Sequence, residues 1–263
     1  MTGVNKTLYI PLYGKAYVSR KGIILSDKKA EEIWSAAGKD IPLKGKSKSK
    51  WLAYYMGMRS AVFDGWLRER MSAQPDAVVL HIGCGLDSRI LRVGAQGHLW
   101  FDMDFADVIE ERRQWYSEDE CYHMLAGDAR CSDWLAQLPE GGELIAVIEG
   151  VSMYLTEDEL RGLLSRLSSR FNSVSLLMDC YTSFAAKASR YKNPINDVGV
   201  TQVYGVDDPA ALSDGTGLSF VKEHEITPQT MINELQGMEK AIFKRVFGGS
   251  FSKKMYRLYE LGK

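Results

Sequence analysis

Short apolar runs alternate with amphipathic helical patterns through the middle of the chain. Helical patterns cover residues 105–116 and 157–170, and the second begins with a capping box formed by Thr156 and Glu159. The apolar runs predict strands at residues 77–82, 98–104, 121–125, 143–149 and 173–179. Strands that alternate with helices indicate a mostly parallel sheet with right-handed crossovers. We therefore predict an α/β protein whose ligand binds at the carboxyl ends of its strands.

Two helices are predicted before the first strand. Residues 26–38 begin with a serine that can cap a helix and end with a glycine that can stop one. Residues 51–70 are apolar nearly all round, and Arg59 shares a helix face with large apolar side chains. A guanidinium in such surroundings either extends to water or pairs with the carboxylate of a ligand. The spacing alone leaves both interpretations open.

Beyond residue 180 the alternation becomes weaker. Residues 181–214 are rich in Asn, Pro, Gly and Asp, which is typical of an insertion or a lid. An amphipathic helix is predicted over residues 227–246, where Thr-Pro provides the cap and the first helical position. Residues 218–226 and 253–261 are predicted to form a closing antiparallel pair of strands.

The composition argues against several classes of protein. Lys and Arg number 33 against 34 Asp and Glu, so the net charge of −1 lacks the basic excess of a nucleic-acid binder. No apolar run has the length of a membrane span, and the N-terminus lacks the pattern of a signal peptide. The four cysteines are scattered and no histidine cluster accompanies them, so we expect free thiols, a cytoplasmic location and no metal site.

The strongest chemical signal is the glycine turn that follows the first strand. The apolar run ends at Gly83 and Gly85, and a helix is predicted from Asp87 or Ser88. Glycine has no Cβ, so the chain can bend here and a nucleotide can approach the backbone. A dinucleotide fingerprint would need a third glycine at the position of Ser88. The turn therefore argues against NAD and favours adenosine bound without a pyrophosphate, as in S-adenosylmethionine.

Acidic residues stand at the ends of the next three strands. They are Asp102 and Asp104 after the second strand, Asp128 after the third and Glu149 after the fourth. One such residue is ordinary in a loop, but a succession beside a glycine turn predicts an acidic rim around a ligand site. Such a rim can hold ribose hydroxyls, an adenine amino group and a sulfonium or ammonium.

These segments together resemble a known family. The chain is similar to the leucine carboxyl methyltransferase family, and most of all to the bacterial branch of tetracenomycin-type polyketide O-methyltransferases. The resemblance covers roughly residues 8–180 and rests on the segments IPLYGKA (10–16), HIGCGLDSR (81–89), FDMD (101–104), AGDAR (126–130) and IEGVSMYLT (148–156).

The resemblance implies the class I methyltransferase fold. This is a Rossmann-like α/β sandwich around a seven-stranded, mostly parallel sheet, with an N-terminal helical cover and an insertion after strand five. We expect one domain with three parts, which are the cover (1–72), a cofactor-binding core (75–180), and the insertion with the closing strands (181–263). The implied cofactor is S-adenosylmethionine, which leaves as S-adenosylhomocysteine.

The family pattern also implies which residues hold the methionine part of the cofactor. Gly83, with Gly85 in the same turn, would line it, and Glu149 would face its ammonium group. Arg59 would pair with its carboxylate, which decides the open question in favour of a binding role. Lys15 stands where the family has a basic residue and would share that role.

The nucleoside part is assigned in the same way. Asp104 would take the ribose hydroxyls, with Asp102 before it on the acidic rim, and Asp128 would mark the adenine end beside Ala129. The family usually has leucine at the position of Ala129 and threonine at that of Ser88. Both departures would alter the contacts that pack against the adenine, but neither changes which cofactor the family pattern implies.

The expected reaction is O-methylation of a small molecule, such as a polyketide-like or other secondary metabolite, at a carboxylate or a phenol. We favour the carboxylate, and the choice between the two stays open. A carboxylate is already ionised at neutral pH and needs no general base, and we assign no catalytic residue. Tyr154, Tyr181 and Tyr204 are candidates for the acceptor pocket, although each can equally be a packing residue. A protein carboxyl methyltransferase, a non-catalytic cofactor-binding protein and a nicotinamide oxidoreductase are the alternatives. The sequence leaves the acceptor and the oligomeric state open.

Overall fold

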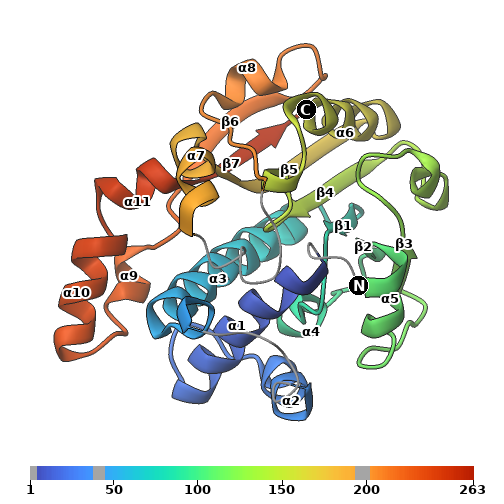
Figure 1. Ribbon diagram of the computed structural model, residues 1–263. Coiled ribbons are helices and arrows are strands. Elements are labelled where there is room, and N and C mark those ends of the chain that lie inside the picture. Colours follow the sequence, from blue (N-terminus) through green and yellow to red (C-terminus); the bar gives the residue numbers. More distant parts are fainter. Residues whose placement is uncertain (1–4, 38–44, 193–201) are drawn as a thin grey trace.

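A central sheet organises the molecule. The structure is a computed structural model that describes residues 5–37, 45–192 and 202–263 (Figure 1). Its seven strands lie in the order β3-β2-β1-β4-β5-β7-β6. The strands β1 to β5 pair in parallel, and β7 pairs antiparallel with both β5 and β6. The strands are β1 Val78–Ile82, β2 Trp100–Asp104, β3 Tyr122–Ala126, β4 Glu143–Ile148, β5 Ser173–Tyr181, β6 Ser219–His224 and β7 Tyr256–Gly262. Each forms close to its predicted position, and the predicted α/β fold is confirmed.

Helices surround this sheet. The α-helices are α1 Tyr9–Lys21, α2 Lys28–Ala37, α3 Lys50–Ala73, α4 Arg89–Val93, α5 Ala106–Arg112, α6 Glu157–Arg170, α7 Ser183–Lys192, α8 Pro209–Ser213, α9 Gln229–Ile232, α10 Gly237–Phe247 and α11 Ser250–Met255. Short 3-10 helices are η1 Asn5–Leu8, η2 Gly45–Lys48, η3 Asp133–Gln137 and η4 Ser152–Tyr154. Over the part of the chain that the structure describes, no helix has the length and apolar character needed to cross a membrane.

Two apolar layers cover the two faces of the sheet. Side chains alternate along a strand, so Val79 of β1 enters the layer under α1, α2 and α3, while Leu80 enters the layer under α6 and α8. Figure 1 shows these two groups of helices on opposite sides of the sheet. β1 is buried along its whole length, as a central parallel strand requires. This packing directs the carboxyl ends of β1 to β4 to one edge of the sheet.

The N-terminal cover contains a helix that the sequence analysis did not predict. Helix α1 carries Pro11 and Gly14, which are poor helix formers, although proline is tolerated in a first turn. Gly14 lies against α3, where a Cβ would come within 2.8 Å of the Met56 Cβ. On α3 a Cβ at Gly57 would come within 2.8 Å of Val18 Cγ2. The two helices therefore cross at close range because each contributes a glycine.

The C-terminal region corrects one prediction. The single helix predicted over 227–246 is wrong, because the chain forms α9 and α10 with a break between them. Gly237 begins α10 with a φ of +52°, and the Glu234 carboxylate within the break accepts a hydrogen bond from the Ile24 amide (2.6 Å). The predicted pairing of the last two strands is confirmed, but residues 250–255 form α11 before β7 begins. The predicted insertion contains α7 and α8, and residues 193–201 within it lie outside the described residues.

Candidate active site

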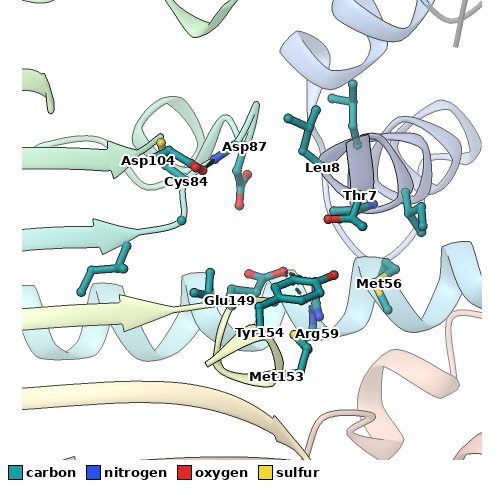
Figure 2. A pocket seen from close by; sticks show the side chains of 18 of the residues that line it. Thr7, Leu8, Met56, Arg59, Cys84, Asp87, Asp104, Glu149, Met153 and Tyr154 are labelled. Atoms are coloured by element: carbon teal, nitrogen blue, oxygen red, sulfur yellow. Dashed lines mark hydrogen bonds and ion pairs between the residues drawn. The ribbon is translucent and has the colours of Figure 1, made fainter. Parts of the chain in front are cut away.

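A cavity of about 1160 Å³ opens at the carboxyl ends of β1 to β4. Pockets for one small ligand have volumes of roughly 300–1,000 Å³, so this cavity is larger than one small ligand usually needs. Its lining has two halves. The turns after β1, β2, β3 and β4, with Lys15 of α1 and Arg59 of α3, form one half. The other half comes from η1, η4, α7, α10, α11, the cavity ends of β5 and β7, and apolar side chains of α1 and α3. Figure 2 shows Asp104 and Cys84 on one side of the cavity, Thr7 and Met56 on the other, and Glu149 and Arg59 between them.

The glycine turn after β1 adopts a conformation that other residues avoid. Gly83 has a φ of +71° and Gly85 a φ of +51°. A Cβ on Gly83 would lie 2.0 Å from Val151 Cγ2, so a side chain here would collide with the loop after β4. The Gly85 amide donates a hydrogen bond to Asp104 Oδ2 (2.8 Å). The turn therefore brings backbone to the cavity, and it also binds the acid at the end of β2.

The two acids of β2 have different places in the structure. Asp104 lines the cavity and also accepts a hydrogen bond from the Phe105 amide. Burial raises its pKa to about 6, and the two backbone hydrogen bonds only partly oppose this effect. Asp102 is fully buried and lies outside the lining of the cavity, where it pairs with Arg112 and accepts a hydrogen bond from the Tyr122 hydroxyl (2.8 Å). Asp102 therefore does not reach a ligand in the cavity, which corrects its predicted place among the cofactor contacts.

The turn after β3 brings Asp128 and Ala129 to the cavity, as the sequence analysis expected. The Asp128 carboxylate pairs with Arg130, whose Nη2 lies 2.5 Å from Oδ2 and whose Nε lies 2.9 Å from Oδ1. Hydrogen bonding to Arg130 lowers the pKa of Asp128. Arg130 also lines the cavity, and the sequence analysis missed it.

Three charged residues of the predicted site meet at the base of the cavity. Lys15 Nζ lies 3.0 Å from Asp87 Oδ1, and Arg59 Nη2 lies 3.0 Å from Glu149 Oε1. Glu149 also pairs with Arg89. Burial by itself would raise the pKa of Glu149, but the two guanidinium groups lower it to about 2, so the carboxylate is ionised. Arg59 is 4% exposed and does not extend to water.

The pairs around these residues form a buried network that the sequence analysis missed. Arg92 Nη1 contacts Asp27 (2.7 Å) and Asp87 (2.7 Å), and its Nε contacts Asp64 (2.6 Å). Arg89 Nε also contacts Asp64 (2.9 Å). The network joins the helical cover to the turn after β1. A sequence signal existed, since both arginines follow the glycine turn within one helix.

The second half of the cavity is apolar and rich in tyrosine. Tyr154 and Tyr181 line it as predicted, and Tyr55 and Tyr256 join them. Tyr204 does not, because it faces a separate cavity of about 250 Å³ beyond η4. Other lining residues of this half include Leu52, Met56, Met153, Ala185, Phe247 and Met255. Among the described residues of the chain, no group of His, Cys, Asp or Glu is placed to hold a metal ion.

Comparison with known proteins agrees with this geometry. The tetracenomycin polyketide synthesis O-methyltransferase TcmP of Streptomyces glaucescens is 28% identical over 244 residues, which are 91% of this chain and 89% of that protein. The S-adenosyl-L-methionine-dependent methyltransferase dpfgK of Gibberella zeae is 28% identical over 233 residues, 81% of this chain and 78% of that protein.

A solved structure shares the fold. The magnesium protoporphyrin IX methyltransferase of Synechocystis PCC 6803, solved with bound SAH (S-adenosylhomocysteine), aligns with a TM-score of 0.53 and 13% identity over 90% of this chain and 100% of that one. At this identity the likeness concerns the fold alone. The model of the leucine carboxyl methyltransferase family matches residues 12–168, more than half of the sequence. The chain therefore belongs to the leucine carboxyl methyltransferase family.

Proposed function

We propose that this protein is an S-adenosylmethionine-dependent O-methyltransferase that methylates a carboxylate on a small, apolar, polyketide-like acceptor. The observation that carries the proposal is the division of one cavity into a charged half beside a glycine turn and an apolar half rich in tyrosine. The charged half suits an adenosine with an amino-acid end. The apolar half suits an uncharged ring system held close to it. Family membership and the relative named for polyketide synthesis support the same reaction.

The residues of the charged half fit the cofactor in chemical type. Asp104 would accept hydrogen bonds from the ribose hydroxyls, and Asp128 with Ala129 would meet the adenine. The ionised Glu149 would face the ammonium group. When bound, S-adenosylmethionine supplies an electrophilic methyl group for displacement by an oxygen nucleophile. The contribution of the chain is to align that oxygen with the methyl group and to exclude water.

Lys15 and Arg59 would meet the carboxylate of the cofactor. Arg59 already has protein partners, but a guanidinium has five N–H donors and can serve a further acceptor. Gly150 leaves one edge of it uncovered, since a Cβ there would lie 3.5 Å from Arg59 Nη2. The φ of +74° at Gly150 also favours glycine.

The protonation state of the tyrosines in the apolar half favours a carboxylate acceptor over a phenol acceptor. Burial raises the pKa of Tyr55 and Tyr154, so these hydroxyls stay protonated and act as donors rather than bases. A phenol, with a pKa near ~10, would need a base at neutral pH, whereas a carboxylate with a pKa near ~4 would not. The tyrosine hydroxyls can orient an anionic acceptor without protonating it.

The proposal includes a cytoplasmic location. The observation that favours it is that all four cysteines, Cys84, Cys121, Cys131 and Cys180, are free thiols in the structure.

The experiment that tests the function uses methyl-labelled S-adenosylmethionine. The purified protein is incubated with aromatic carboxylic acids and with matched phenols of the same ring systems, and the products are treated with mild base. We expect label in base-labile methyl esters, and none with Glu149→Ala, whose cofactor affinity should fall. Label in stable phenol ethers would contradict the carboxylate assignment. Label on peptide C-termini alone would favour a protein substrate, and cofactor binding without turnover on any acceptor would favour a non-catalytic role.

A further inference from the structure

A closed triangle of contacts joins Arg59 to Asp179 and Tyr256 at the wall of the cavity. Arg59 Nη1 donates hydrogen bonds to Asp179 Oδ2 (2.9 Å) and to the Tyr256 hydroxyl (2.9 Å). The Tyr256 hydroxyl donates in turn to Asp179 Oδ2 (3.0 Å). The three groups come from α3, β5 and β7, and the latter two pair as antiparallel neighbours. One end of the Arg59 guanidinium is therefore held by two side chains that hold each other.

The other oxygen of Asp179 acts on the loop after β4. Asp179 Oδ1 accepts a hydrogen bond from the Gly150 amide (2.7 Å), next to Glu149 in the chain. Asp179 is itself fully buried and lies outside the lining of the cavity. A single carboxylate thus binds two of the elements that are proposed to meet the amino-acid end of the cofactor, α3 and the loop after β4. It can influence a ligand only through them.

We propose that Asp179 and the Tyr256 hydroxyl are positioning residues, which fix the Arg59 guanidinium and the Glu149–Gly150 turn in the orientation that receives the amino-acid end of S-adenosylmethionine. The inference rests on the proposed function. Arginine has several rotatable bonds, and ordering it before the ligand arrives removes an entropic cost from binding. Nη1 is occupied by the triangle and Nη2 pairs with Glu149 Oε1, so the guanidinium is held from both ends beside Gly150 at the wall of the cavity.

A purely structural role predicts a different outcome. Any buried guanidinium needs an anionic partner, so loss of Asp179 would destabilise the fold whatever the ligand. Such an effect would weaken all ligands of the cavity alike. A positioning role weakens only those ligands that carry the amino-acid end. The two roles are separated by comparing S-adenosylhomocysteine with 5′-methylthioadenosine, which has the same nucleoside and thioether but no amino-acid end.

The test is calorimetric titration of the wild type, Asp179→Asn and Tyr256→Phe with both ligands. We expect the Kd of S-adenosylhomocysteine to rise about tenfold or more in Asp179→Asn and about threefold to tenfold in Tyr256→Phe, as for the loss of hydrogen bonds to a charged group. The Kd of 5′-methylthioadenosine should stay within about twofold. Tyr259→Phe is the matched control, because it makes the same change on β7 in the opposite apolar layer. It should alter neither affinity.

Each other result has a definite meaning. If folded variants bind S-adenosylhomocysteine as tightly as the wild type, or lose both ligands equally, the positioning role is wrong while the proposed function stands. If the wild type binds neither ligand, the proposed function fails and the inference fails with it. Should Asp179→Asn not fold, Tyr256→Phe carries the test alone, since it removes one oxygen and keeps the ring.

Discussion

Asp102 and Asp104 stand two positions apart on β2 and have opposite electrostatic environments. Burial by itself would raise the pKa of Asp102, but Arg112 lowers it to about 2, so this acid is an ionised partner inside the apolar layer. Asp104 has backbone amides instead of an arginine as partners, and burial raises its pKa to about 6. An acid with spare acceptor capacity at a cavity is suited to a ligand. At the scale of single residues, the partner decides whether a carboxylate supports the fold or serves the site.

The environment of Asp104 predicts a pH-dependent affinity. Ribose hydroxyls donate more strongly to the ionised carboxylate, so the affinity for S-adenosylhomocysteine should fall below pH 6, by about tenfold per pH unit at most. Asp104→Asn should bind about tenfold more weakly at pH 7.5 and lose this dependence. Titration calorimetry between pH 5 and pH 8 measures both. If the variant keeps the same pH profile, the pH dependence arises from another group. Asp179 is a candidate, because burial also raises its pKa to about 6.

At the scale of elements, the crossing of α1 and α3 positions the cationic side of the site. Gly14 precedes Lys15 on α1, and Gly57 stands two residues before Arg59 on α3. Because each glycine lies at the point where the helices touch, the two cations reach the same cavity from different helices. Close approach of the helices is therefore part of the geometry of the site.

Gly14→Ala should disturb this crossing. The added Cβ would lie 2.8 Å from the Met56 Cβ and 3.4 Å from the Ala53 Cα, so the helices must separate. Gly65→Ala on α3 is the control, because nothing lies within 4 Å of its added Cβ. Both changes bring the same gain in helix propensity, so we expect Gly14→Ala to be less stable than Gly65→Ala by about 1–3 kcal/mol in urea unfolding. It should also bind S-adenosylhomocysteine more weakly. Equal stability of the two variants would show that α1 and α3 accommodate the added methyl group without separating.

At the scale of the whole molecule, buried ion pairs join the cover to the sheet. Lys15–Asp87, Arg92–Asp27 and Arg59–Asp179 each link an N-terminal element to the core, and all these side chains are nearly inaccessible to solvent. Breaking a buried pair leaves an uncompensated charge, which costs about 3–5 kcal/mol. A cover attached in this way should not unfold separately from the sheet.

We therefore predict one cooperative thermal transition for the whole chain, as expected of a single domain. S-adenosylhomocysteine at 100 times its Kd should stabilise the folded state by about 2.7 kcal/mol and move the transition as a unit. Calorimetric and circular dichroism melts, with and without the ligand, measure this. Two transitions, of which the ligand moves only one, would divide the chain into separate domains.

Local patterns predicted much of the fold and part of the site. The strands and the start of α6 were predicted because side-chain periodicity and the Thr156–Glu159 capping box depend on neighbouring residues, and the structure contains both sides of that box. The break between α9 and α10 was not predicted. Within it the Glu234 carboxylate accepts a hydrogen bond from the Ile24 amide, 210 residues away in the sequence, which no local pattern predicts.

The sequence by itself determined the α/β architecture, the glycine turn and the acids at the ends of the strands, because these follow from local periodicity and from the backbone conformations that only glycine adopts readily. Only the tertiary structure decided which acids reach the cavity, that Tyr204 faces another cavity, and that Asp179 and Tyr256 both bind Arg59. Those contacts depend on where each strand ends and on the register of β7, which returns antiparallel beside β5. No local pattern encodes that register, since packing across the whole sheet sets it.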